Sequence, residues 1–283
     1  MTSLGSEVAA AVFSAVAALI VLWAAIRMGF FYSRQGKKNL VDQPTLLLVA
    51  GAFLIYFGIC TFTPSLLLKI FSNWMLNRSI ELSALLNFLT GGAIIVAFAL
   101  YMQAIYRPIT QSILGSAQLK DLKTNILIAL TACLVAYPLV ICIGQILEIA
   151  VYLIFHTLQI PDQVAILFLK TTFGKPLYFF FATVSIIIFA PLIEELLFRG
   201  FLQSYLRRYM AAPWAIAISS LSFAFFHYSK DQGLGNIPII GSLFVLANFL
   251  GFVYERQRTL LAPMILHAIF NMLSITNLYF FGI

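Results

Sequence analysis

Charge is scarce in this sequence. Only 10% of the 283 residues are charged and 62% are hydrophobic, whereas an ordinary soluble domain is roughly 25% charged. So little charge excludes an ordinary soluble globular chain, and the mean hydropathy of +0.99 indicates a polytopic membrane protein. The net charge of +7 is no sign of nucleic-acid binding, because the basic residues cluster between hydrophobic runs.

Cysteine is scarce as well. The three cysteines, Cys60, Cys133 and Cys142, fall inside apolar segments. Their spacing matches neither a metal motif nor a disulfide framework, so we interpret them as small buried hydrophobic residues. The N-terminus also lacks the basic residues that open a cleavable signal peptide, and the apolar stretch 8–28 predicts a retained first helix.

Long hydrophobic runs make up most of the chain. A membrane span needs about 20 apolar residues. The fold class is therefore expected to be all-α, a polytopic helical membrane bundle of about eight transmembrane helices. The expected spans are 8–28, 45–66, 82–104, 125–147, 177–198, 213–228, 237–254 and 259–281.

The basic residues predict an orientation for this bundle. Most of the 17 fall in the connections that would be cytoplasmic if the N-terminus lies outside, as positive-inside bias requires. Both termini are then out, and Glu194 lies near the cytoplasmic end of its span. The compact connections favour a bacterial inner (plasma) membrane.

The longest polar connection, about 105–124, divides the chain into two parts. Residues 1–120 are expected to hold transmembrane helices without buried charge, whose role is unassigned and which take no part in the chemistry. Residues 121–283 are expected to hold the chemistry, with a motif core at about 177–275.

Polar and ionisable residues recur inside the apolar runs of the second part. They are Glu194, Glu195, Arg199, His227, His267 and Asn271. An ionised side chain at the bilayer centre costs about 2.5–3.5 kcal/mol on insertion scales. A membrane protein with no use for such residues would be expected to lose them, so the set indicates a reaction centre.

Helical spacing gives the two glutamates different roles. Residues four apart share a helical face, whereas neighbours point about 100° apart. Glu195 can therefore pair with Arg199, while Glu194 is left to face a cavity, where an unpaired carboxylate suits a general base. Pro191 is expected to loosen the helix and to free backbone groups that must line protein or water.

The histidines extend this pattern. His267 and Asn271 are one turn apart and present two hydrogen-bond donors on one face, as stabilisation of an oxyanion requires. His227 ends a run rich in aromatic residues, so its surroundings should be poor in water. Phe223 lies one turn before His227 and is placed to wall the site.

Each feature also has a purely structural interpretation. A buried Glu–Arg pair often only holds helices together, and a lone amide commonly bonds between membrane helices. The joint pattern is harder to explain in this way, because structural pairs do not require two spare histidines and a spare carboxylate. Other polar residues in or beside the apolar segments are interpreted as structural: Asn87, Gln145, Glu148 and His156.

Three motifs make the chain resemble the CAAX protease and bacteriocin-processing (CPBP, Abi) family of intramembrane proteases, related to the Ras-converting CAAX prenyl endopeptidase. The motifs are EExxxR at 194–199, FxxxH at 223–227 and HxxxN at 267–271. They occur in the family's order, each on its own hydrophobic segment. The resemblance covers roughly residues 177–275.

This resemblance implies an intramembrane endopeptidase. Its substrate would be a membrane-associated or lipidated protein or peptide, prenylated or leader-bearing. Glu194, assisted by His227, would activate the attacking water. His267 and Asn271 would stabilise the oxyanion of the tetrahedral intermediate.

The resemblance also implies that Glu195 and Arg199 brace the site. The family has been viewed both as metalloproteases and as metal-independent glutamate-type proteases. If Zn²⁺ or another divalent metal is used, Glu194, His227 and His267 are the expected ligands, with a position left for water. The amide of the third motif is a hydrogen-bond donor and not a usual zinc ligand, which favours the metal-free scheme.

Two other functions remain open from the residues. Glutamate and histidine inside a membrane also form proton relays, so a proton-coupled transporter is the main alternative. Against it, transporters usually show paired halves with matching broken helices, and here all the buried charge lies in the second half. A non-proteolytic membrane scaffold is the third interpretation.

Overall fold

The computed structural model describes residues 4–32, 42–70, 79–115, 119–157 and 161–281. All regular structure in these ranges is helical, which confirms the predicted all-α membrane bundle. Seven helices are long and apolar enough to cross a membrane. The segment expected as the sixth span, 213–228, forms the shorter helix α10 (Ala212–Phe226) of 15 residues.

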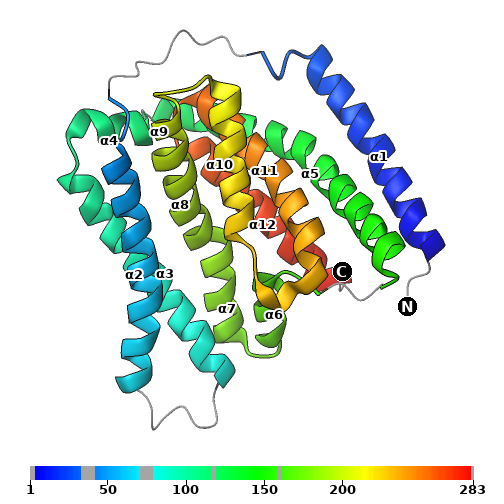
Figure 1. Cartoon of the computed structure of the whole chain (residues 1–283), viewed down its shortest axis with the longest axis horizontal. Coiled ribbons are helices and arrows are strands. Elements are labelled where there is room, and N and C mark those ends of the chain that lie inside the picture. The colour runs from blue at the N-terminus through cyan, green and yellow to red at the C-terminus, as the bar shows by residue number, and fades with distance from the viewer. Residues whose placement is uncertain (1–3, 33–41, 71–78, 116–118, 158–160, 282–283) are drawn as a thin grey trace.

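The N-terminal helices are α1 (Leu4–Arg27), α2 (Leu46–Ile70) and α3 (Ser79–Ala104). Helix α1 packs against α5 (Leu119–Phe155), whereas α2 and α3 pack together on the other side of the bundle (Figure 1). The hydroxyl of Ser14 donates to Oε1 of Gln145 at 2.6 Å. This bond ties α1 to α5 and gives Gln145 a structural role.

A single helix, Pro176–Leu206, runs through the middle of the bundle, and we call it the central helix. Its successive segments are α7 (Pro176–Val184), η2 (Ser185–Phe189), α8 (Ala190–Glu195), η3 (Leu196–Gln203) and α9 (Ser204–Leu206). The remaining elements are the short helices α4 (Arg107–Leu114), α6 (Val164–Thr171) and η4 (Lys230–Gly235), and the long helices α11 (Asn236–Gln257) and α12 (Leu261–Phe281).

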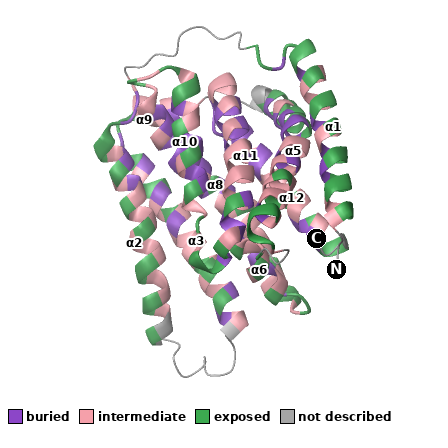
Figure 2. Cartoon of the chain, turned by 45° about the vertical axis from the view of Figure 1, so that its right-hand side comes forward, coloured by how far each residue is buried: buried purple, intermediate pink, exposed green. Residues whose placement is uncertain are grey.

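The buried residues lie mainly in the middle of the bundle, and the exposed residues lie on its outer helices. Buried residues gather where the central helix meets α10 and α11, while the outward faces of α1 and α2 are exposed (Figure 2). These outward faces are apolar: Phe13 is 78% exposed and Phe62 is 74% exposed. A face of this kind suits contact with lipid, since lipid tails are as apolar as leucine.

Small residues let α11 approach the central helix closely. A Cβ atom at Gly251 would lie only 2.7 Å from Oε1 of Gln203, and Ala247, one turn earlier, is fully buried. This close approach allows Nε2 of Gln203 to donate to the Gly251 carbonyl at 3.1 Å. The contact fixes the central helix against α11 just beyond Arg199, and so helps to position the polar residues of α8.

Candidate active site

The central helix departs from α-helical hydrogen bonding on both sides of the two glutamates. Segments η2 and η3 are π-helical, a form often found at functional sites. Each π-helical N–H bonds the carbonyl five positions earlier, and Pro191 has no N–H to give to Ile186. Nδ2 of Asn271 donates to that Ile186 carbonyl instead, at 2.8 Å. The third motif is thereby tied to the opened helix.

Glu195 and Arg199 form a fully buried ion pair. Nη1 of Arg199 donates to Oε1 of Glu195 at 3.0 Å, across one turn as their spacing predicts. Nη2 donates to the Ala247 carbonyl at 3.0 Å, and the guanidinium carbon lies 4.6 Å from the centroid of the Phe223 ring. These added contacts offset the desolvation of the two charges.

His267 joins this pair from α12. It is 4% exposed, and its Nδ1 lies 2.9 Å from Oε1 of Glu195. The ionised carboxylate can only accept, so Nδ1 carries a proton and the ring is held in one orientation. Nε2 of His267 then points towards Glu194, whose Oε2 lies 3.9 Å away.

His227 is oriented by its own motif. Its Nδ1 lies 2.9 Å from the Phe223 carbonyl, which can only accept, so this nitrogen also carries a proton. Nε2 is left with a lone pair, 3.7 Å from Oε2 of Glu194. The Phe223 ring centroid lies 4.8 Å from that of His227 and 5.8 Å from that of His267. Phe223 therefore packs against both imidazoles and forms an apolar wall.

Glu194 is the carboxylate that Arg199 does not bind. Its side chain is 14% exposed, and its buried Oε2 atom has no hydrogen-bond partner in the described part of the chain. The gaps of 3.7 and 3.9 Å to the two imidazoles are too long for direct hydrogen bonds. Oε2 of Glu194 therefore lies close to both imidazoles without a direct hydrogen bond to either.

The site opens into a cavity of about 630 Å³, which we call the catalytic cavity. The candidate residues that line it are Glu194, His227, His267 and Asn271. A neighbouring cavity of about 420 Å³ also includes Glu194 in its lining. Glu194 therefore borders two adjoining cavities.

The N-terminal helices contribute to both cavities. Tyr56 of α2 and Ser83 and Asn87 of α3 line the catalytic cavity and its neighbour. We expected residues 1–120 to take no part in the chemistry, and sequence reasoning missed these contributions. A single tyrosine or asparagine in an apolar helix matches no motif, so its position opposite Glu194 is visible only in the folded chain.

The candidate ligands have the chemistry of a zinc site, at a spacing slightly wider than that of a bound zinc ion. Both Nδ1 atoms are occupied, which leaves the Nε2 lone pairs of His227 and His267 available beside Glu194. Two tetrahedral ligands at 2.0–2.1 Å from zinc lie about 3.4 Å apart, closer than these atoms. Within the ranges that the structure covers, no group of three His, Cys, Asp or Glu side chains is arranged to hold a metal.

Comparison with known proteins agrees with the motifs. Residues 176–273 match the family model described as Type II CAAX prenyl endopeptidase Rce1-like. The match contains all three motifs, and it confirms the resemblance that they indicated. It supports a CAAX-type intramembrane endopeptidase in general terms. No curated protein and no solved structure gives a significant match to the chain.

Proposed function

We propose that this chain, similar over residues 176–273 to the Type II CAAX prenyl endopeptidases, is an intramembrane endopeptidase in which Glu194 and His227 activate water. One observation carries the proposal. Oε2 of Glu194 and the Nε2 atoms of His227 and His267 converge beside one cavity, at separations of 3.7 and 3.9 Å. A water molecule placed among them would be held by hydrogen bonds, with Glu194 and His227 able to accept its two O–H groups.

The number of hydrogen-bond donors and acceptors around the proposed water indicates which of the three side chains is protonated. A water molecule has two O–H donors, whereas Glu194, His227 and His267 offer three acceptor atoms in their neutral-imidazole form. One imidazole must therefore be protonated for every group to be satisfied. His267 is best placed, because Glu195 accepts from its Nδ1 at 2.9 Å and stabilises the charged ring. A protonated His267 donates from Nε2 and does not compete for the water's protons.

The proposed reaction begins when Glu194 removes a proton from this water, with His227 holding the second O–H. The water oxygen bonds to the scissile carbonyl carbon, and the carbonyl π electrons move onto oxygen to give a tetrahedral oxyanion. When this intermediate collapses, the C–N bond breaks and the proton held by Glu194 passes to the leaving amine. The products are a free carboxyl group and a free amine.

The oxyanion is assigned to His267 and Asn271. A side-chain amide has two N–H donors, and Asn271 uses one on the Ile186 carbonyl. The other is left for the cavity that Asn271 lines. Donors held in place before the reaction stabilise developing charge most effectively, and the bond to Ile186 supplies that rigidity. Glu195 and Arg199 act as positioning residues.

The shape of the hollow space suits an endopeptidase. The two adjoining cavities at Glu194, of about 630 and 420 Å³, offer room for a peptide segment next to the proposed base. The proposed substrate is a membrane-associated or lipidated protein or peptide, prenylated or leader-bearing.

In the proposed organisation, residues 121–283 form the protease domain, and residues 1–120 add the cavity wall made by α2 and α3. The proposed location is a bacterial inner membrane, with the N-terminus out and the site towards the cytoplasm.

A divalent metal is the alternative for the same residues. Glu194, His227 and His267 would hold the ion, and a small inward movement of these side chains would bring the three donor atoms to ligand spacing. When bound, such an ion acidifies a bound water and polarises a carbonyl group. Asn271 favours the metal-free scheme, because its amide is a hydrogen-bond donor and not a usual zinc ligand.

The test is quantitative mapping of new peptide termini in membranes that contain either the wild type or Glu194→Gln at matched levels. Termini present only with the wild type are expected, and they would also identify the substrates. Glu148→Gln, in α5 and outside the catalytic cavity, is the matched control and should keep the wild-type pattern. Identical termini from wild type and Glu194→Gln, both folded and abundant, would favour a transporter or a scaffold.

A further inference from the structure

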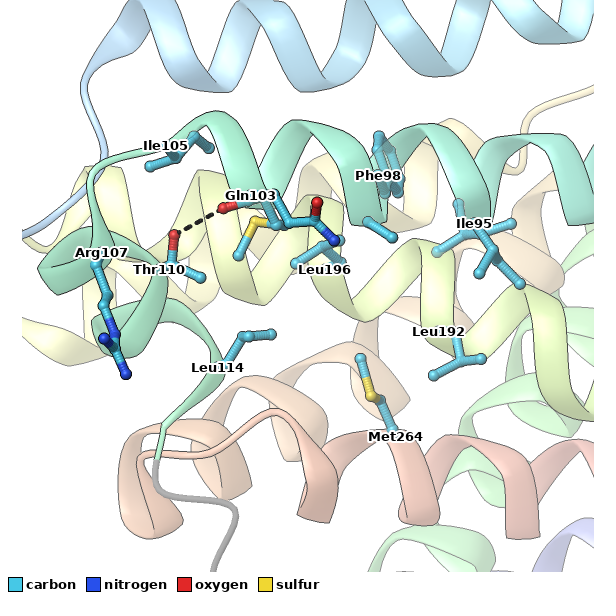
Figure 3. Close-up of a pocket in the computed structure, with 13 residues that line it drawn as sticks. Ile95, Phe98, Gln103, Ile105, Arg107, Thr110, Leu114, Leu192, Leu196 and Met264 are labelled. Atoms are coloured by element: carbon cyan, nitrogen blue, oxygen red, sulfur yellow. Dashed lines mark hydrogen bonds between the residues drawn. The ribbon is translucent and has the colours of Figure 1, made fainter.

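A separate hollow of about 540 Å³ lies beside the central helix, and we call it the α3–α4 groove (Figure 3). Helices α3 and α4 form one wall. Leu192, Ile193 and Leu196 of the central helix and Met264 of α12 form the other. Its volume lies within the range of about 300–1,000 Å³ that is usual for small-molecule sites.

Polar groups gather at one end of this apolar groove. Ile95 and Leu192 lie at one end, and Arg107 and Thr110 lie at the other, beside α4 (Figure 3). The hydroxyl of Thr110 is already used, since it donates to the Met102 carbonyl at 3.1 Å. Among the residues that the structure describes, Arg107 is the only charged one in the lining. A ligand of this groove should therefore have one long apolar part and one anionic end.

Arg107 differs from other arginines at its end of the bundle. Arg207 pairs with Glu255 at 3.3 Å, Arg208 donates to the carbonyls of Gln43 and Pro44, and Arg256 donates to the Phe30 carbonyl. Arg107 is exposed, and among the described residues it makes no hydrogen bond or ion pair. Its charge is free to bind a ligand.

Backbone contacts fix the end of α4 against the segment that precedes α12, on opposite walls of the groove. The backbone N–H of Leu260, next to the start of α12, donates to the carbonyl of Leu114 at the end of α4, at 3.2 Å. Gly115 has a positive φ of 75° and approaches the Arg258 backbone more closely than any residue with a Cβ could. Arg107 and the apolar walls are therefore held in fixed relative positions.

We propose that the α3–α4 groove binds an anionic phospholipid of the surrounding bilayer, with one acyl chain along the groove and the phosphate at Arg107. Arginine recognises phosphate through paired N–H donors. A basic end of a membrane protein also attracts anionic lipid electrostatically. Lipid binding at this groove does not require peptidase activity.

The bound chain would brace the catalytic elements. Ile193 precedes Glu194, and Met264 lies one turn before His267. An acyl chain that fills the groove therefore packs against both helices that carry these groups. Filling an apolar void restores the contacts that its lining otherwise lacks, so the lipid should raise the melting temperature of the protein.

The experiment measures lipid retained by the purified full chain. Protein equilibrated in mixed micelles with equal phosphatidylglycerol and phosphatidylcholine is examined by native mass spectrometry. The wild type should retain phosphatidylglycerol preferentially. Arg107→Gln should reduce that preference about tenfold, as expected for loss of a hydrogen bond to a charged group. Ala99→Phe, which fills the groove, should lose both lipids, and Lys123→Gln, an exposed basic residue outside the lining, should behave as wild type.

Several outcomes would overturn the proposal. They are wild-type retention of phosphatidylglycerol by Ala99→Phe, an unchanged lipid preference in Arg107→Gln, and an equal loss in Lys123→Gln. A second measurement needs no variant: a phosphatidylglycerol with a photoreactive acyl chain is crosslinked to the wild type and the labelled peptides are mapped. Labels should fall on 95–102 and 192–196, and labels confined to other helices would contradict the site.

Discussion

The imidazole of His267 donates from Nδ1 to Oε1 of Glu195 at 2.9 Å, although 72 residues separate the two along the chain. The same oxygen accepts from Arg199 at 3.0 Å. Glu195 therefore lies between a cation and an imidazole, and it links the first motif to the third. Its neighbour Glu194 is left unpaired beside the cavity.

Glu194→Gln should lower the cleavage rate by a factor of about 10²–10⁴, the usual contribution of a general base. The melting temperature should change little, because Oε2 of Glu194 has no hydrogen-bond partner among the described residues. Cleavage assays and thermal unfolding on one preparation check both points. A variant that keeps half or more of the wild-type activity would remove Glu194 from the role of base.

Glu195→Gln should instead destabilise the protein, by about 3–5 kcal/mol, because it leaves Arg199 buried without its counter-charge. Denaturant titration in detergent measures the change in the free energy of unfolding. Lys170→Gln is the matched control, since it breaks an exposed pair with Asp162 and should cost no more than about 1 kcal/mol. Equal effects of the two substitutions would mean that the buried pair does not hold the helices together.

Asn271→Ala should lower kcat by about 10²–10³, the effect of losing one oxyanion donor, and should also reduce stability because the Ile186 carbonyl loses its partner. Asn277→Ala controls for stability. It removes a similar bond on the same helix, from Nδ2 to the Tyr137 hydroxyl at 3.1 Å, outside the catalytic cavity. If both variants lose stability and both keep kcat, Asn271 is only structural.

Asn87→Leu should raise KM roughly 2- to 10-fold with little change in kcat, the effect expected from one lost hydrogen bond to substrate. This residue of α3 lines the cavity at a distance from the motifs in sequence. Asn248→Leu is the control, because its amide bonds within its own helix, to the Phe244 carbonyl, and does not line the cavity. An unchanged KM in Asn87→Leu would restrict substrate binding to the second part of the chain.

Metal removal separates the two catalytic schemes. Dialysis against a strong chelator should leave cleavage intact, and elemental analysis of the active protein should find well under one divalent ion per chain. Loss of activity that returns when Zn²⁺ is added would assign Glu194, His227 and His267 as metal ligands. Repeating the measurement with His227→Ala, which removes one such ligand, would then show reduced metal content as well as reduced activity.

The sequence predicted the local part of the site well, because that part depends on helical periodicity. Glu195 and Arg199 are four positions apart and pair as expected. His227 and Phe223 share the same spacing, and the imidazole bonds the carbonyl one turn earlier. Other contacts had no such signal. The bond between Asn271 and the Ile186 carbonyl depends on a π-helical turn, which no periodicity indicates.

The lengths of the apolar runs and the order of the residues are properties of the chain alone, and they were enough to predict a helical membrane protein with its polar residues concentrated on a few apolar segments. Which polar groups meet is a property of the folded bundle. Glu195, Arg199 and His267 are buried together, while Glu194 faces the space that Tyr56 and Asn87 also line. Contacts between distant segments depend on how the helices pack, and that packing is set by the whole bundle at once.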